Sequence, residues 1–449
     1  MKKIKDINIK QVVRISLSSL MVAIVFLSGC IGDDLLNIVF PEEGLDQIEE
    51  DLQDSLQQPE PVLTPAPTIT PQLLENISIW IPPQFGPDAK TESGKIMLSH
   101  IASFRDQYPG FEIDLRVKAD SGSSSMINSL LVASSVAPST LPSLVLISHS
   151  DIEQAVELGL IQPIQEFSAI FDENDWFSVA EKMSMYHDEV YGLPFASDAI
   201  GLIQHTNTIG SAYVPLANSD ELLNTINFAA GSPDSLVPFL YYQSIGGMFT
   251  VDMGHVTMDE SLINEVLLSF KTYHEIGLFP NTLLNFQSEE QLWDAFKSNQ
   301  VENMITWLSL PQAEGGDYFL SPVPSIGTDP ISYGKGWVWC LVIQETNAIK
   351  PNIIFLEHII DSNFLTEWTP TTAYLPVRTS SIAGWNELQR ESIRTILQSA
   401  ELLPEEIVLS KINSDMIIEL QNVILGSSSP EESTLAIMDK LSEDLTNEE

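Results

Sequence analysis

Two tryptophans and one aspartate are of residue types that could bind a small polyhydroxylated solute. Planar aromatic rings accept the apolar C–H face of a sugar, and a carboxylate accepts two of its hydroxyl groups. Trp307 follows a short apolar segment, and Trp337 follows the loop-like stretch 333–336. Asp198 stands where the apolar run 199–204 begins. The alternatives are a core position for either tryptophan and, for Asp198, a hinge acid that caps local backbone.

Four polar residues could supply further hydrogen bonds to a solute. Ser123 and Ser124 offer hydroxyl and backbone N–H groups just before a predicted helix, although serine-rich loops are also ordinary turns. His149 lies at the expected carboxyl end of a strand, the edge at which ligands gather in α/β sheets. Arg378 could clamp a solute, or could balance the acidic surface of a chain with few basic residues.

Motifs that would indicate catalysis are missing from the sequence. It contains no His-Glu-x-x-His zinc motif, no Gly-x-Ser-x-Gly nucleophile elbow and no P-loop. The 7 histidines are scattered without metal-ligand spacing, and acidic residues are too abundant for any pair to indicate a glycosidase. We therefore expect a binding protein with no catalytic residues, no metal and no cofactor.

The first residues carry the features of an export signal. A lysine-rich start precedes an apolar run at 17–27, which is too short for a lasting membrane span. Leu27-Ser-Gly-Cys30 follows and resembles the end of a bacterial lipoprotein signal. That resemblance implies cleavage of residues 1–29 and a lipid on Cys30; the alternative is an ordinary signal with an incidental cysteine. Only Cys340 then remains, so no internal disulfide can form, and we interpret it as a small buried hydrophobe.

The chain is strongly acidic, with 20 Lys and Arg residues against 62 Asp and Glu residues and a formal net charge of −42. A protein of this charge does not bind nucleic acid through phosphates, which requires clustered basic residues. It is also repelled by an anionic membrane surface, so its attachment would depend on the lipid. Residues 30–74 are acidic and then rich in proline, which predicts an extended tether.

The remaining sequence alternates between strand and helix patterns, which predicts an α/β protein. Its length suits two lobes, with the solute held where the chain crosses between them at about 191–207. The predicted strands cover 77–81, 111–117, 144–147, 199–204, 304–307, 318–324 and 336–343. The predicted helices cover 95–108, 126–132, 151–158, 219–228, 237–244, 261–276, 289–298, 353–362, 387–400, 415–425 and 430–441.

Several segments, in this order, resemble the family 1 extracellular solute-binding proteins, which include the maltodextrin-binding proteins. The segments that carry the resemblance are Ile79-Trp80, Phe104-Arg-Asp-Gln-Tyr-Pro-Gly-Phe111, Leu141-Pro-Ser-Leu-Val-Leu-Ile-Ser-His149, Glu157-Leu-Gly-Leu-Ile-Gln-Pro163, the crossing from Tyr191 to Asn207, Tyr242-Gln-Ser-Ile-Gly-Gly-Met-Phe249, 295–304, Ser321-Pro-Val-Pro324 and Ala373-Tyr-Leu-Pro-Val-Arg378. The resemblance implies a periplasmic-binding-protein-like fold of type II, with discontinuous lobes joined by a hinge. It also implies a monomer, anchored on the extracytoplasmic face of the cell membrane, that captures a sugar or oligosaccharide for the permease subunits of an ABC importer.

The resemblance adds candidate residues and lobe boundaries. It implies an aromatic residue at the position of Trp307, and a cleft aromatic with a close backbone approach at Tyr242 and Gly247. Tyr241 takes the place of Tyr242 if that helix is rotated. The predicted segments are 75–196 for the N-terminal lobe, 197–317 for the C-terminal lobe, 318–367 for the return to the N-terminal lobe, and 368–449 for the helical remainder of the C-terminal lobe.

Three departures from the family leave the solute open. Ser143 stands where the family often has Asp, Ile147 where maltodextrin binders carry an aromatic residue, and Ser150 where they carry an acid. Two other functions remain as alternatives. One is a solute-sensing lipoprotein of the same fold without an import role, and the other is a secreted hydrolase, which would require a catalytic acid pair.

Overall fold

The structure of the protein is a computed structural model. It describes residues 75–88, 90–164, 168–205, 213–221, 225–315, 318–343 and 349–446. The predicted signal, the predicted lipidation site at Cys30 and the predicted tether lie outside these residues. The chain from Gln72 to Glu449 forms one compact unit. Within the ranges given above, no helix is both long and apolar enough to cross a membrane.

One lobe is built on a parallel sheet that continues into two antiparallel strands. β1 (Glu75–Ile81) lies between β2 (Phe111–Val117) and β3 (Leu144–Ser148), and both pairings are parallel. β12 (Ser332–Val342) runs antiparallel to β3, and the first half of β7 (Gly192–Gln204) runs antiparallel to β12. The strands predicted at β1, β2 and β3 are confirmed, because alternating and continuous apolar runs are direct records of one-sided and two-sided burial.

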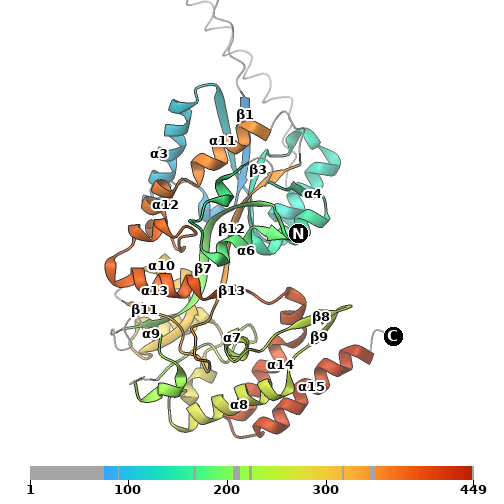
Figure 1. Cartoon of the computed structure of the whole chain (residues 1–449), viewed down its shortest axis with the longest axis vertical. Coiled ribbons are helices and arrows are strands. Elements are labelled where there is room, and N and C mark those ends of the chain that lie inside the picture. The colour runs from blue at the N-terminus through green and yellow to red at the C-terminus, as the bar shows by residue number, and fades with distance from the viewer. Residues whose placement is uncertain are drawn as a thin grey trace, which may run out of the picture. The chain divides into compact units, whose positions relative to one another are not determined.

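Helices with one apolar face cover this sheet (Figure 1). They are α3 (Glu92–Gln107), α4 (Met126–Val136), α5 (Ile152–Glu157), α6 (Ser178–Met183), α11 (Ile349–Ile359), α12 (Ser362–Trp368) and α13 (Glu387–Gln398), with the short strands β4 (Ile161–Gln162), β5 (Met185–Tyr186) and β6 (Glu189–Val190) between them. The Thr91 side chain caps α3 by accepting a hydrogen bond from the Gly94 amide. Met97 and Phe104 belong to the stripe that this helix buries against the sheet.

The other lobe is dominated by helices. β10 (Asn303–Trp307) and β11 (Phe319–Ser321) pair with the second half of β7. Around them lie α7 (Val237–Ser244), α8 (Glu260–Glu275), α9 (Glu289–Lys297), α10 (Ser309–Glu314), α14 (Glu406–Ile424), α15 (Pro430–Thr446) and a hairpin of β8 (Thr250–Asp252) and β9 (His255–Thr257). Asp259 caps α8, and the apolar residues that follow at helical spacing, such as Ile263 and Phe270, are fully buried.

Three strands carry the described chain between the lobes. β7 is buried at all 13 of its positions, and it pairs first with β12 and then with β10. β12 carries the chain back to the first lobe. β13 (Ala400–Leu402) runs parallel to the start of β12 and leads the chain into the second lobe again. Each lobe is therefore assembled from segments that are far apart in the sequence.

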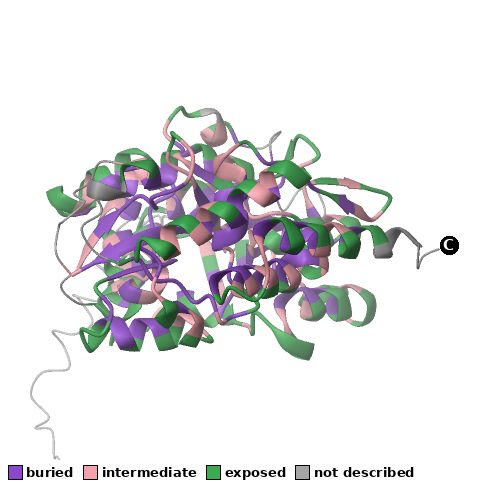
Figure 2. Cartoon of the chain, turned by 90° about the horizontal axis from the view of Figure 1, so that it is seen from below, coloured by how far each residue is buried: buried purple, intermediate pink, exposed green. Residues whose placement is uncertain are grey.

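Buried side chains form two large groups, and Figure 2 shows exposed residues on the outward faces of the surrounding helices. Leu146 and Phe355 belong to the group around the parallel sheet. Phe270 and Leu420 belong to the group in the helical lobe. Cys340 is buried in the first group, and burial raises the pKa of its thiol, so it is a packing residue as the sequence predicted.

Strand pairing and core packing bear on two of the predicted lobe boundaries. The chain does not return to the first lobe at 318, because β11 still pairs with the second half of β7; the return occurs along β12. Trp368, Ile393 and Leu397 pack into the buried group around the parallel sheet, but so do Trp293 and Met304 of α9 and β10, so the boundary at 368 stays a prediction. The apolar stripe of a helix looks the same in sequence whichever lobe it covers, so periodicity does not place it.

The helix predicted over 219–228 is wrong in its described parts. Leu216–Glu221 forms a short 3-10 helix, and Asn227 forms an isolated parallel bridge with Met304. Tertiary pairing with β10 therefore outweighs the helical periodicity of this stretch. The other predicted helices are present, with ends that shift by several residues. The elements that were not predicted are α6, α10, α12, β13 and the short strands β4, β5, β6, β8 and β9.

Candidate functional site

Asp198 lies where β7 leaves the first lobe, and only 1% of its side chain is exposed. One carboxylate oxygen accepts hydrogen bonds from the amides of Ala199 and Ser309, both at 2.9 Å. The other accepts a hydrogen bond of 2.6 Å from the Ser309 hydroxyl. Burial raises the pKa of Asp198, while the Lys335 charge and these hydrogen bonds oppose the rise. Asp198 therefore fixes the first turn of α10 to the crossing strand, which agrees with the capping interpretation.

Lys335 and Trp307 form the more accessible part of the same cluster. Lys335 stands opposite Asp198 in the pairing of β7 with β12, and its Nζ lies 3.8 Å from Asp198 Oδ2. The same Nζ lies 3.8 Å from the centroid of the Trp307 ring, a cation–π contact from a crossing strand to the second lobe. The Lys335 side chain is 41% exposed and Trp307 is half-buried. Trp307 is therefore not a plain core residue.

Glu289 completes this cluster from the first turn of α9. Its Oε2 accepts hydrogen bonds from the Thr306 hydroxyl at 2.5 Å and from the Trp307 amide at 3.3 Å. Burial raises the pKa of Glu289, and the Lys335 charge opposes this rise. We call Asp198, Glu289, Trp307 and Lys335 the charged cluster. Glu289 and Lys335 were not predicted. Glu289 lies at the start of a predicted helix, and Lys335 lies in the stretch 333–336, which was predicted as loop-like but belongs to β12.

Three aromatic rings stand beside the charged cluster on the first lobe. The Phe85 ring stacks on Tyr374 with a centroid distance of 5.0 Å and meets Trp337 edge-on at 5.4 Å. Burial raises the pKa of Tyr374 to about 12; the Asp198 charge adds to this, and hydrogen bonds from Trp337 and Gln84 oppose it. We call Phe85, Trp337 and Tyr374 the aromatic wall. Tyr374 was missed, although it is the one aromatic residue of the segment 373–378.

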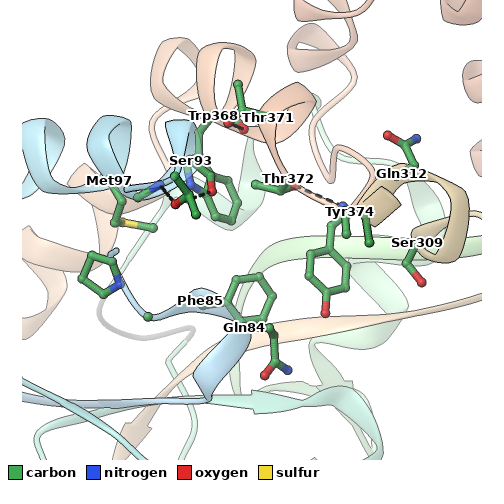
Figure 3. Close-up of a pocket in the computed structure, with 16 residues that line it drawn as sticks. Gln84, Phe85, Ser93, Met97, Ser309, Gln312, Trp368, Thr371, Thr372 and Tyr374 are labelled. Carbon is green, nitrogen blue, oxygen red and sulfur yellow. Dashed lines mark hydrogen bonds between the residues drawn. The ribbon is translucent and has the colours of Figure 1, made fainter. Parts of the chain in front are cut away.

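A cavity of about 490 Å³ opens between two residues of the aromatic wall, Phe85 and Tyr374, and α10; the third, Trp337, does not line it. Figure 3 shows Ser309 and Gln312 on α10, together with Phe85, Thr372 and Tyr374, which also line the cavity. Gln312 also lines the cavity, and among the described residues its buried Nε2 has no hydrogen-bond partner. A cavity of this size, with apolar walls and a few polar groups, suits a small solute.

His149 lies next to the charged cluster at the end of β3. The Gly336 amide, on the crossing strand β12, donates a hydrogen bond of 3.4 Å to its Nδ1. Burial lowers the pKa of His149 to about 4, and the Lys335 charge contributes to the shift. The ring is therefore neutral at pH 7. Of the residues predicted from sequence, the structure brings Asp198, Trp307, Trp337 and His149 together.

Tyr242 and Gly247 do not line the cavity, which corrects their prediction as cleft residues. Tyr242 is fully buried in the core of the second lobe, where the Asp259 amide donates to its hydroxyl at 2.7 Å. A Cβ atom at Gly247 would lie 2.5 Å from the Tyr242 ring. The close backbone approach predicted at Gly247 is real, but its partner is Tyr242. Tyr241, the alternative, is also fully buried.

Arg378 is likewise a structural residue and not a clamp in the cleft. Only 2% of its side chain is exposed, and its Nη1 lies 2.7 Å from Glu173 and 3.3 Å from Asp175. Its guanidinium stacks on Trp176 at 4.1 Å, and its Nε donates to the Ile360 carbonyl at 3.0 Å. A buried guanidinium needs carboxylate partners. The partners of Arg378 are distant from it in the sequence, so the sequence alone does not show that they meet.

Ser123 and Ser124 are exposed and line a different cavity, of about 400 Å³, beside α4. The next residue, Ser125, caps that helix by accepting a hydrogen bond from the Asn128 amide at 3.3 Å. The turn interpretation therefore describes this loop. No group of three or more His, Cys, Asp or Glu side chains in the described part of the chain is arranged to hold a metal ion.

Comparison with known proteins gives matches in structure only. No protein-family model matches the sequence, and no curated protein matches it. A family 1 extracellular solute-binding protein from Alicyclobacillus acidocaldarius aligns with a TM-score of 0.65 at 15% identity, covering 83% of this chain and 98% of that one. The fold is that of the two-lobed periplasmic binding proteins.

Other structures with this two-lobed fold carry sugars. Maltose-binding MalE of Listeria monocytogenes, in complex with maltose, aligns with a TM-score of 0.64 at 11% identity, covering 84% of this chain and 99% of that one. A cyclo/maltodextrin-binding protein complexed with maltotetraose aligns with a TM-score of 0.61 at 17% identity, covering 83% and 98%. Many of the similar structures are maltose- or maltodextrin-binding proteins. In this two-lobed protein, Asp198 and Lys335 of the charged cluster lie on the crossing strands β7 and β12, whereas the cavity is lined by the β1–α3 turn, α3, α10 and the segment 368–374.

Proposed function

We propose that this protein belongs to the family 1 solute-binding proteins and captures a sugar or oligosaccharide for an ABC importer. The observation that carries the proposal is the cavity between the aromatic wall and α10. It presents the rings of Phe85 and Tyr374 together with the polar side chains of Ser309 and Gln312. Aromatic faces for C–H surfaces and polar groups for hydroxyls are the combination that sugars require. Structures of the same fold that hold maltose or maltotetraose support this class of solute.

The cavity also provides a mechanism for closure. One side belongs to the first lobe, through the β1–α3 turn and the loop after α12, and the other belongs to α10 of the second lobe. A solute that contacts both sides is bound more tightly when the lobes approach, so binding favours the closed state. The crossing strands β7, β12 and β13 would serve as the hinge.

We further infer that the mature protein is held at the extracytoplasmic face of the cell membrane by a lipid on Cys30, with residues 30–74 as a tether. The segment Leu27-Ser-Gly-Cys30 supports this inference. Replacing Cys30 with alanine should release the protein from the membrane fraction. Delivery to permease subunits is tested by solute uptake in cells that lack this protein. Uptake that persists would favour the alternative, a solute-sensing lipoprotein.

The solute class is tested by a thermal-shift screen of the full chain against sugars, polyols and amino acids. A ligand that binds only the folded state adds about 2.7 kcal/mol at a hundredfold excess over its Kd. Tyr374→Ala should weaken a sugar hit by at least about tenfold, equal to about 1.4 kcal/mol. Tyr186→Ala, an aromatic residue of the same lobe on the β5–β6 hairpin, is the matched control. If no sugar raises the melting temperature, the carbohydrate proposal is wrong.

A further inference from the structure

The Lys335 ammonium occupies the position in which a sugar ring would stack on Trp307. Its Nζ lies 3.8 Å from the ring centroid, and carbon atoms in van der Waals contact are about 3.5–4.0 Å apart. A solute that uses this face of Trp307 must therefore displace Lys335. The displacement is sterically easy, because the lysine side chain is 41% exposed and its 3.8 Å contact with Asp198 is longer than a hydrogen bond.

Displacement of Lys335 changes the charge balance of the cluster. Asp198 is buried, Glu289 is partly buried, and the positive charge of Lys335 favours the ionised form of both carboxylates. A neutral ring in place of the ammonium would leave two carboxylates in a partly desolvated cleft without their cation, which is unfavourable. A protonated amine in the same place would replace the charge one for one, and the displaced lysine would be hydrated in the cleft.

We propose that Trp307, Asp198 and Glu289 form a cation subsite, which Lys335 fills in the free protein, and that the solute carries a protonated amino group that exchanges with Lys335. This inference rests on the proposed solute-binding function and names its solute class as an amino sugar or an oligomer of amino sugars. The adjoining aromatic wall then takes the uncharged rings. The arrangement of an indole face with two carboxylates is the chemistry that recognises organic ammonium groups.

The experiment compares two ligands that differ in charge at one group per ring. The full chain is titrated in a calorimeter with a glucosamine oligomer and with the N-acetylated oligomer of the same length. We expect the amine-bearing oligomer to bind at least tenfold more tightly, and this preference to shrink as salt rises from 0.05 to about 0.5 M because screening weakens charge contacts. This comparison needs no variant and is independent of any loss of folding.

Variants then assign the preference to the subsite. Lys335→Met removes the competing ammonium and should tighten binding of the amine-bearing oligomer by about tenfold, whereas Glu289→Gln should reduce the preference for it. Lys118→Met is the matched control, because the Lys118 ammonium lies 4.2 Å over the Trp80 ring in the same kind of contact, outside the cleft. The control should leave both affinities unchanged.

The outcomes separate this inference from the function on which it rests. Equal affinity for the two oligomers, or tighter binding of the N-acetylated one, overturns the cation subsite and leaves sugar capture intact. The cation subsite is also overturned if Lys118→Met abolishes the preference for the amine-bearing oligomer while Glu289→Gln retains it. If neither oligomer binds and neutral maltodextrins do, the cation subsite is overturned alone. If no sugar of any kind binds, the proposed function and the inference both fall.

Discussion

Replacing Asp198 with alanine is the perturbation that best separates a structural role from a ligand-binding role. The carboxylate holds the first turn of α10 to β7 through two hydrogen bonds from Ser309, at 2.9 and 2.6 Å. It is also the acid that faces Lys335 at 3.8 Å. Its polar contacts are made within the protein. We therefore expect Asp198→Ala to destabilise the chain even when no solute is bound.

The expected loss of stability follows from the hydrogen-bond and charge partners of Asp198 that Asp198→Ala would leave unpaired. A hydrogen bond to a charged group contributes about 1.5–3 kcal/mol, and removal of one partner of a buried ion pair costs about 3–5 kcal/mol. Lys335 is partly exposed, so its share is reduced by solvent. Removing the carboxylate also removes the free-energy cost of burying its charge, which offsets part of the loss of stability. We therefore expect Asp198→Ala to lower the free energy of unfolding by about 3 kcal/mol, and Asp198→Asn by about 1 kcal/mol because its amide still bonds Ser309.

Urea unfolding of the full chain without solute measures this effect as a shift in midpoint at unchanged slope. Asp106→Ala, an exposed acid on α3, is the control and should stay within about 0.5 kcal/mol of the unmodified protein. A change of less than 0.5 kcal/mol in Asp198→Ala would refute the bracing role. Loss of solute affinity without loss of stability would leave Asp198 with a ligand-binding role alone.

Three further predictions concern the hinge, the pH dependence and the first lobe. Gly192→Ala should cost about 2 kcal/mol in urea unfolding, because its Cβ would lie 2.4 Å from the Trp339 carbonyl oxygen; an unchanged midpoint would mean that the crossing strands shift freely. The pKa of His149 is lowered to about 4 in the folded chain, while the unfolded ring titrates near 6.5. As pH falls from about 6.5 to 4, only the unfolded state therefore takes up the proton. The free energy of unfolding should drop by up to about 3 kcal/mol over this range. In His149→Gln, this drop should be missing from the plot of stability against pH. Arg378→Met should destabilise the chain by about 2 kcal/mol, since Glu173 and Asp175 lose their buried partner. It should leave solute affinity unchanged in calorimetry, and a selective loss of affinity would restore its predicted role as a clamp.

Local patterns in the sequence were sufficient for most elements and for the crossing. The alternation in β1, the continuous apolar run of β3 and the periodicity of α8 each record which faces of the element are buried. Asp198 was identifiable because a lone carboxylate in an apolar segment needs partners, although β7 begins at Gly192 and Asp198 lies within it. The sequence did not supply those partners, since Ser309 and Lys335 are distant along the chain and meet Asp198 only where α10 and β12 pack against β7.

What the sequence determined by itself was the set of buried faces, the two-lobed organisation suggested by length and resemblance, and the acidic character of the surface. What only the tertiary structure decided was which aromatic residues face the cavity. Tyr242 was predicted as a cleft aromatic and Tyr374 was not, yet Tyr242 is fully buried and Tyr374 lines the cavity. The physical reason is that burial of a ring depends on what packs against it from other segments, and local periodicity contains no information about that partner.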